Sequence, residues 1–166
     1  MQKPSSVMVF GVLNLLFAVL GFFGTIGSVL VLLGMNTDNP VHVIMQESAV
    51  YRAFMYVSVP LGLIFIGMLA LAGVGLLMSK PWGRTATIVY AIYAIVMGLI
   101  GSLFSTVFLV VPLLEQASHA SGPEAAGAVG GAVGGLFGGC IGLFYPIFQL
   151  IFMYRKNVVE YFKQVK

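Results

Sequence analysis

Four long apolar stretches without a charged residue constrain this chain more than any other feature of its sequence. They are residues 7–34, 53–79, 85–114 and 125–154. Because a helix needs about 20 predominantly apolar residues to cross a bilayer, each stretch can span with residues to spare. The sequence therefore predicts an all-α fold: an integral membrane bundle of four transmembrane helices with these bounds.

Composition supports the same class. Hydrophobic residues make up 60% of the chain and charged residues 8%, whereas soluble domains contain about 25% charged residues. We expect a single domain over residues 1–166, because the four spans leave no room for a second one. The last residues, 155–166, are predicted to form a short amphipathic cytoplasmic tail on the inner leaflet, with Val158, Phe162 and Val165 on one side.

The basic residues orient the predicted bundle. Arg52 is the only one on the side of the first and third loops, together with most of the acidic residues. The others fall at the N-terminus, in the second loop and in the tail: Lys3, Lys80, Arg84, Arg155, Lys156, Lys163 and Lys166. By the positive-inside rule, both termini are predicted to be cytoplasmic. The net charge of +3 then faces the inner leaflet, and no nucleic-acid partner is predicted.

Turn and cap residues indicate how the segments between the predicted spans are structured. Asn39 and Pro40 resemble a helix cap followed by proline at the first helical position, so a short outer helix is predicted before the second span. Pro60 lies inside that span and is expected to kink it. In the inner turn, Pro81 should end the second span and Trp82 should anchor at the headgroup level. Residues 116–123 are predicted to form the second outer loop.

The fourth stretch is unusually rich in glycine. On a helical wheel, eight glycines form two neighbouring ridges: Gly127, Gly131, Gly135 and Gly139, and Gly130, Gly134, Gly138 and Gly142. Helices associate in lipid through close backbone approach at small residues, so this face predicts a packing surface for another helix. Tyr145 and Gln149 continue the same stripe with polar groups.

Two further stretches carry small faces. The first has a heptad-like seam of Gly11, Asn14, Ala18, Gly21, Thr25 and Ser28, and the third has a row of Ala94, Gly98, Ser102 and Thr106. Two interpretations stay open. The small faces pack against one another inside one bundle, or at least one glycine ridge of the fourth stretch meets another chain.

Few side chains offer chemistry. Asn14, Tyr145 and Gln149 are intramembrane polar groups, suited to interhelical hydrogen bonds or, alternatively, to contact with a solute. His42, Glu115 and His119 lie on the outer side and form a weak candidate for zinc or copper, the alternative being solvated loop residues. No Asp, Glu, Lys, Arg or His lies in the middle of a span, which argues against a proton-driven pump and against an intramembrane hydrolase. We therefore predict no enzyme, no catalytic residue and no cofactor.

The segment GLLMSKPWGRTATIVYAIYAI, residues 75–95, resembles the inner hairpin of small four-span bacterial membrane proteins. In these proteins a glycine-ended helix is followed by a basic Pro-Trp-Gly/Ala-Arg turn and a new apolar helix. The resemblance covers about a fifth of the chain. It implies the bacterial cytoplasmic (inner) membrane and no particular activity.

Three functions follow as hypotheses, and the third of them is a membrane enzyme whose outer metal site would be built from His42, Glu115 and His119. In the first, the chain is a non-enzymatic assembly protein, a scaffold or accessory subunit that packs through the glycine face of its fourth span. Its partners would be the lipid bilayer and either further copies in a homo-oligomer or the other subunits of a larger membrane complex. In the alternative, it is a homo-oligomeric pore or passive transporter for a small solute, lined by Asn14, Gln149 and small residues.

Overall fold

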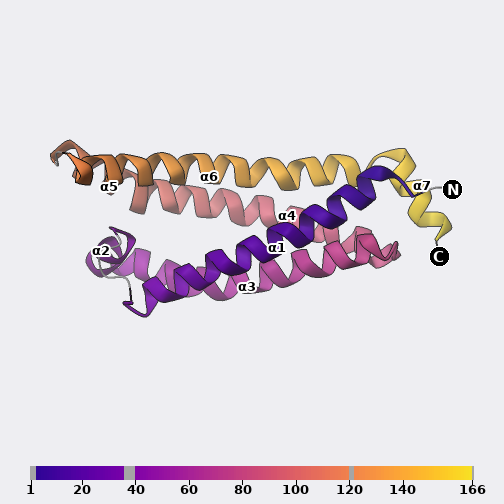
Figure 1. Ribbon diagram of the computed structural model, residues 1–166, viewed down its shortest axis with the longest axis horizontal. Helices are drawn as coiled ribbons and strands as arrows, with labels where there is room; N and C mark the ends of the chain where they lie inside the picture. Colours follow the sequence, from indigo (N-terminus) through magenta and orange to yellow (C-terminus); the bar gives the residue numbers. More distant parts are fainter. Residues whose placement is uncertain (1–2, 36–39, 120–121, 166) are drawn as a thin grey trace. The chain divides into compact units, whose positions relative to one another are not determined.

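The computed structural model describes residues 3–35, 40–119 and 122–165. In this part of the chain 91% of the residues are helical and no strand occurs, which confirms the all-α class. The elements are α1 (Ser5–Leu32), α2 (Pro40–Glu47), α3 (Ala49–Leu77), α4 (Pro81–Ser105), the π-helical turn η1 (Thr106–Val110), α5 (Val111–His119), α6 (Pro123–Met153) and α7 (Lys156–Gln164) (Figure 1).

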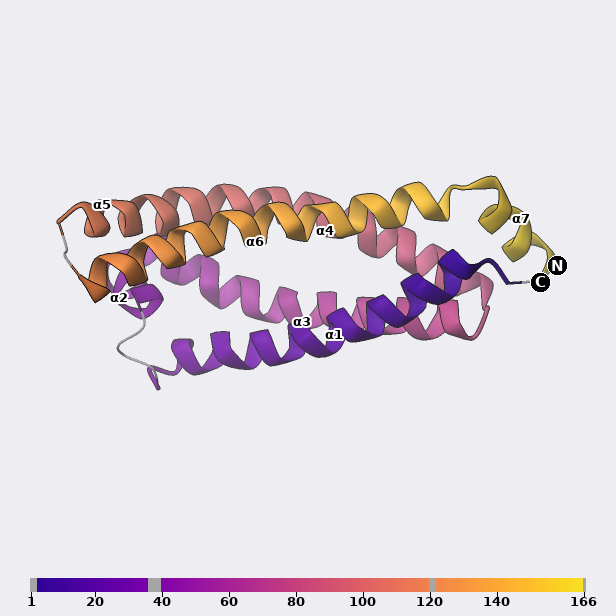
Figure 2. The same ribbon diagram turned by 45° about the horizontal axis from the view of Figure 1, so that its top comes forward.

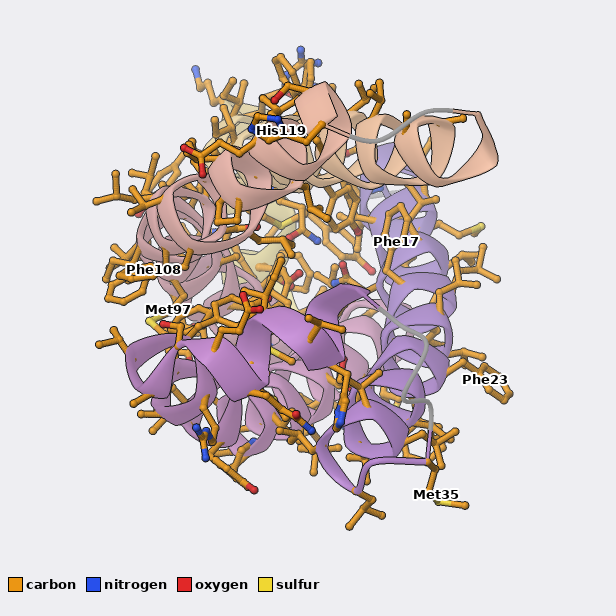
Figure 3. The ribbon with its side chains drawn as sticks, turned by 90° about the vertical axis from the view of Figure 1, so that its left-hand side faces the viewer. Phe17, Phe23, Met35, Met97, Phe108 and His119 are labelled. Carbon is orange, nitrogen blue, oxygen red and sulfur yellow. The ribbon has the colours of Figure 1, made fainter. Side chains whose placement is uncertain are left out.

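Three helices in the described residues are long and apolar enough to cross a membrane. They are Ser5–Leu32, Ala49–Leu77 and the continuous segment Pro81–His119, and α6 contributes the shorter apolar helix Gly142–Met153. Large apolar side chains on these helices are exposed, such as Phe23, which points away from α1 (Figure 3). A helix that is apolar on all sides is typical of a membrane span.

The first two long helices end earlier than predicted, at Leu32 and Leu77, because each is closed by a left-handed residue. Gly34 has φ 69° and Ser79 has φ 57°. The amide of the residue that follows each one, Met35 or Lys80, donates to a carbonyl five residues earlier, which is the Schellman closure. Glycine tolerates this conformation without cost, whereas serine at position 79 adopts it against its steric preference.

The third long helix begins earlier than predicted. Pro81 does separate α3 from α4, but it stands at the first position of α4, where its missing amide hydrogen costs nothing. The outer loop predicted over 116–123 is also partly wrong, since α5 stays helical to His119. Pro112 follows the π turn η1, in which the Val111 amide bonds to Thr106 O.

The short outer helix is present as α2. It is separated from α3 by Ser48, whose hydroxyl accepts a hydrogen bond from the Tyr51 amide at 3.2 Å and so caps α3. The predicted cap Asn39 lies outside the described residues. Pro60 lies inside α3.

Packing divides the chain into two units, each built from parts of the long helices. Unit 1 comprises Met1–Thr25, Leu61–Val96 and Phe144–Lys166, and unit 2 comprises Ile26–Pro60 and Met97–Leu143. Unit 1 therefore holds the chain ends, the α3–α4 turn and α7, and Figure 2 shows this turn and α7 at the same end of the unit.

Unit 1 has two apolar cores. One joins α1, α3, α6 and α7 through Val7, Phe10, Leu76, Met153, Val158, Tyr161 and Phe162. The other joins α1, α3 and α4 through Ala18, Leu69, Tyr90, Ala91 and Ala94. The core of unit 2 joins α2, α3, η1, α5 and α6 through Ile44, Met45, Tyr51, Val110, Leu113 and Ala132.

Candidate functional site

A cluster of three polar side chains lies inside unit 1. Asn14 of α1 and Gln149 of α6 are fully buried, and Tyr145 lies one helical turn before Gln149. The Tyr145 hydroxyl donates to Asn14 Oδ1 at 2.5 Å, Gln149 Nε2 donates to the same oxygen, and Gln149 Nε2 also lies 3.1 Å from the Tyr145 hydroxyl. The structure thus brings together the three polar residues that the sequence singled out. We call Asn14, Tyr145 and Gln149 the polar cluster.

Small residues allow the polar cluster to form. A Cβ on Gly73 of α3 would lie 3.0 Å from Asn14 Cβ and 3.0 Å from Gly11 O. This close approach lets α3 cover α1 at Asn14. On α6, the i,i+4 spacing of Tyr145 and Gln149 places both on one face. Aromatic rings complete the enclosure, with Phe17 4.6 Å and Phe10 6.2 Å from the Tyr145 ring centroid.

The cluster leaves two polar atoms without a hydrogen-bond partner among the described residues, Asn14 Nδ2 and Gln149 Oε1. Exchanging the oxygen and nitrogen of both amides would leave one donor group and one acceptor unpaired again, so the imbalance does not depend on how the amides are assigned. A buried unpaired polar group costs about 1–3 kcal/mol. The cluster has no charged group and no nucleophile beside a base, so its chemistry is hydrogen bonding.

The predicted seam of α1 packs against α3. A Cβ on Gly11 would lie 2.8 Å from Leu77 Cδ2, and one on Gly21 would lie 3.2 Å from Ile66 Cγ1. Ala18 between them is buried. Farther along, the Thr25 hydroxyl donates to Gly21 O at 2.9 Å, so this polar group is satisfied within its own helix. The small residues of this seam are used inside unit 1.

The α3–α4 turn is the tightest contact of unit 1. A Cβ on Gly75 would lie 2.5 Å from Gly83 Cα and 2.6 Å from Trp82 Cζ3, and a Cβ on Gly83 would lie 2.6 Å from both Gly75 O and Leu76 N. No real side chain tolerates such distances to backbone. The two glycines therefore let the backbones of α3 and α4 touch. The indole of Trp82 packs on Gly75 while remaining 46% exposed, as suits the predicted headgroup-level anchor.

The glycine-rich part of α6 belongs to unit 2, and its glycines differ from one another. A Cβ on Gly139 would lie 3.0 Å from Ser102 Oγ of α4, and one on Gly98 of α4 would lie 2.8 Å from Leu143 Cδ2. Two residues of the row predicted on the third stretch, Gly98 and Ser102, therefore face α6. By contrast, Gly127, Gly130 and Gly142 have open space where a Cβ would stand. For four other glycines of the two ridges the structure describes the helix but not the surroundings: Gly131, Gly134, Gly135 and Gly138.

Cations close the helix ends of unit 1. The Lys3 ammonium donates to Leu77 O at 2.8 Å, and Arg84 Nε donates to Met153 O at 3.0 Å. These carbonyls belong to the last residues of α3 and α6, where a positive charge also offsets the helix dipole. The sequence predicts only the membrane side of these two residues. Their positions beside a helix end could not reveal which helix each would cap.

The tail forms α7, and its apolar side packs on the chain itself. Val158, Tyr161 and Phe162 are buried in a core of unit 1 that includes Val7 and Leu76. This corrects the predicted placement of that side on the lipid leaflet. The residues predicted for the apolar side are also partly wrong, because Tyr161 belongs to the buried side and Val165 is exposed.

The weak metal candidates are not gathered into a site. Within the described residues no three His, Cys, Asp or Glu side chains form a group that could hold a metal ion. His42 is occupied by hydrogen bonds within unit 2: Nδ1 lies 3.3 Å from Val31 O, and Nε2 lies 2.8 Å from Gln46 Nε2. Because a carbonyl only accepts, Nδ1 carries the proton and Nε2 accepts from the amide. Glu115 and His119 are both exposed on α5, and Figure 3 shows the position of His119.

Comparison of the chain with models of known protein families, with curated proteins and with solved structures finds no match. The contacts within units 1 and 2 are therefore the basis for inferring a function.

Proposed function

We propose that the chain is a four-span protein of the bacterial inner membrane with both termini in the cytoplasm. The three long apolar helices α1, α3 and α4–α5 supply three spans. The 31 residues of α6 would rise about 46 Å at 1.5 Å per residue, which exceeds the hydrocarbon thickness of about 30 Å. The concentration of Lys and Arg in the segments that form unit 1 supports the orientation.

Within that topology, we propose a non-enzymatic assembly role in which the glycine face of α6 packs on a second copy of the chain. The observation that carries this proposal is the open space at Gly127, Gly130 and Gly142. In lipid, a helix surface without side chains gains little from acyl tails but packs closely on another helix. Gly130 and Gly142 lie on the same ridge, so a partner helix could follow both. A different membrane subunit in place of the second copy is the alternative outcome of the test.

The test is native mass spectrometry of the full chain after gentle extraction from its own membrane. We compare the unaltered chain with the double variant Gly130→Leu/Gly142→Leu. The matched control is Gly67→Leu, since Gly67 of α3 also has open space but belongs to no glycine ridge. We expect a homo-oligomer that survives in the control and is lost in the double variant.

Two results would count against the proposal. A monomeric unaltered chain would remove the assembly role, and an oligomer unchanged in the double variant would remove the α6 face as its basis. A complex containing a second polypeptide would replace the homo-oligomer with an accessory role. Circular dichroism of each variant separates loss of assembly from loss of the helical fold.

The pore hypothesis receives less support. It needs Asn14 and Gln149 to line a path for solute, but both are fully buried in unit 1 and bonded within the polar cluster. The two amides therefore mainly stabilise the contact between α1 and α6. We do not propose a transport function.

A further inference from the structure

One side of α7 is buried and the other is basic. Val158, Tyr161 and Phe162 are held in the core that also contains Leu76 of α3. This fixes α7 on the end of unit 1. Because its apolar side is already covered by the chain, α7 has no apolar face left to insert among acyl chains, and any external partner must meet its charged side.

The charged side is strongly unbalanced. Glu160 is the only acidic residue among the described residues of unit 1. Its carboxylate lies 3.9 Å from the Lys156 ammonium, but the Lys156 side chain is 86% exposed, and such an exposed pair contributes little. Lys163 is exposed on α7 as well. Arg155, the exposed residue that precedes α7, places its guanidinium 4.0 Å from the centroid of the Phe152 ring.

Not every cation of unit 1 is free. Lys3 and Arg84 are engaged with the carbonyls that end α3 and α6. Among the described residues of unit 1, the exposed cations that remain are Lys80, Arg155, Lys156 and Lys163. Lys80 follows α3 one turn after Leu76, on which α7 packs, so the four belong to one end of unit 1. We call these four residues the basic face.

We propose that the basic face binds the phosphate groups of anionic lipids in the leaflet at this end of the spans. The inference rests on the proposed membrane-spanning topology but not on the assembly role of α6. Charge complementarity indicates a negatively charged ligand, because the four exposed cations are balanced by a single acidic side chain in the described part of unit 1, Glu160. Anionic headgroups attract each Lys or Arg near the membrane surface by about 1 kcal/mol, which corresponds to about fivefold in affinity. Trp82, half-exposed two residues after Lys80, is the kind of side chain that lies at headgroup depth.

The chain carries its own reporter, because Trp82 is its only tryptophan. The full chain is reconstituted in bilayers that contain either brominated phosphatidylglycerol or brominated phosphatidylcholine. Quenching of Trp82 fluorescence then measures the relative affinity of each lipid at this end of unit 1. Quenching by either lipid demonstrates insertion, so a failure of this inference is separate from a failure of the spanning topology.

We expect phosphatidylglycerol to be preferred, and the preference to fall about fivefold for each lysine neutralised in Lys156→Gln/Lys163→Gln. The matched control Lys156→Arg/Lys163→Arg keeps both charges and should keep the preference. Raising the salt concentration should weaken it in the unaltered chain.

Three results would overturn the proposal. Equal quenching by the two lipids would show no selection for negative charge. A preference unchanged in the Gln variant would place its source away from the basic face. Loss of the preference on adding inorganic phosphate, but not chloride at matched ionic strength, would assign the face to a soluble anion.

Discussion

In the part of the chain that the structure describes, glycines pressed against neighbouring backbone occur only in unit 1. In unit 1, Gly73, Gly75 and Gly83 lie against neighbouring backbone, where any side chain would collide. In unit 2, Gly98 and Gly139 meet only the side chains of Leu143 and Ser102. Three further glycines of α6, at positions 127, 130 and 142, meet nothing in the described part of the chain.

This difference shows that a glycine pattern in sequence does not by itself reveal a contact. The densest glycine stretch of the chain includes positions where no neighbour is present, whereas the closest backbone approach involves two isolated glycines, Gly75 and Gly83. Unit 1 also has the polar cluster, which links α1 to α6 by hydrogen bonds. We therefore expect substitutions in the polar cluster and at the backbone-contacting glycines of unit 1 to cost folding stability, and substitutions at open positions of α6 to affect association instead.

The largest effect is expected for Gly83→Ala. The new Cβ would meet Gly75 O and Leu76 N at 2.6 Å, and backbone atoms cannot swing away as a side chain can. Overpacking costs about 1–3 kcal/mol and sometimes more, and we expect the upper end here. Reversible unfolding in mixed micelles measures the loss. The matched control is Gly67→Ala, which has open space on α3. Equal stability of the two variants would show that the tight turn is not required.

A smaller loss is expected for Asn14→Leu, about 1–2 kcal/mol in the same assay, because Gln149 loses its bonded oxygen while remaining buried. The double variant Asn14→Leu/Gln149→Leu should be closer to the unaltered chain than the single variant, since both buried amides are then removed. Additive losses in the double-mutant cycle would show that the two side chains do not interact.

Much of the fold and part of the polar cluster were predictable from the sequence. Helical class and three of the long apolar helices follow from length and composition alone. Asn14, Tyr145 and Gln149 stand out because they are polar within apolar stretches. Their mutual contact is not predictable, because Asn14 is separated from Tyr145 by 131 positions and hydropathy carries no information on which helices pair.

The errors have local physical causes. Ser79 adopts a left-handed conformation that its residue type disfavours, so the sequence predicts the end of α3 two residues late. The sequence predicts Pro81 as a helix stop, although proline is equally suited to begin the next helix. Polar residues at 116–119 indicated a loop, but α5 continues through them to His119. The amphipathic pattern of α7 was recognised, yet the pattern cannot distinguish a lipid surface from the chain's own core.

The smallest effect is expected for Gly98→Ala, which tests the intermediate case between the two kinds of glycine. Its Cβ would lie 2.8 Å from Leu143 Cδ2, the end of a flexible side chain, while Leu143 Cγ is 3.6 Å away. A small rotation of Leu143 relieves the contact, and alanine favours the helix by up to about 1 kcal/mol over glycine. The net change in unfolding free energy should therefore stay below about 1 kcal/mol in either direction.

Gly101→Ala supplies the control for that small change, because Gly101 lies on the same helix with open space around it. The difference between the two variants isolates the cost of moving Leu143 from the gain in helix propensity. If Gly98→Ala proves as costly as Gly83→Ala, then Leu143 is held as rigidly as backbone, and the α4–α6 contact of unit 2 is as tight as the α3–α4 turn. The two units would then differ only in the open glycines of α6, and association, not folding, would have to explain why glycine stands at these positions.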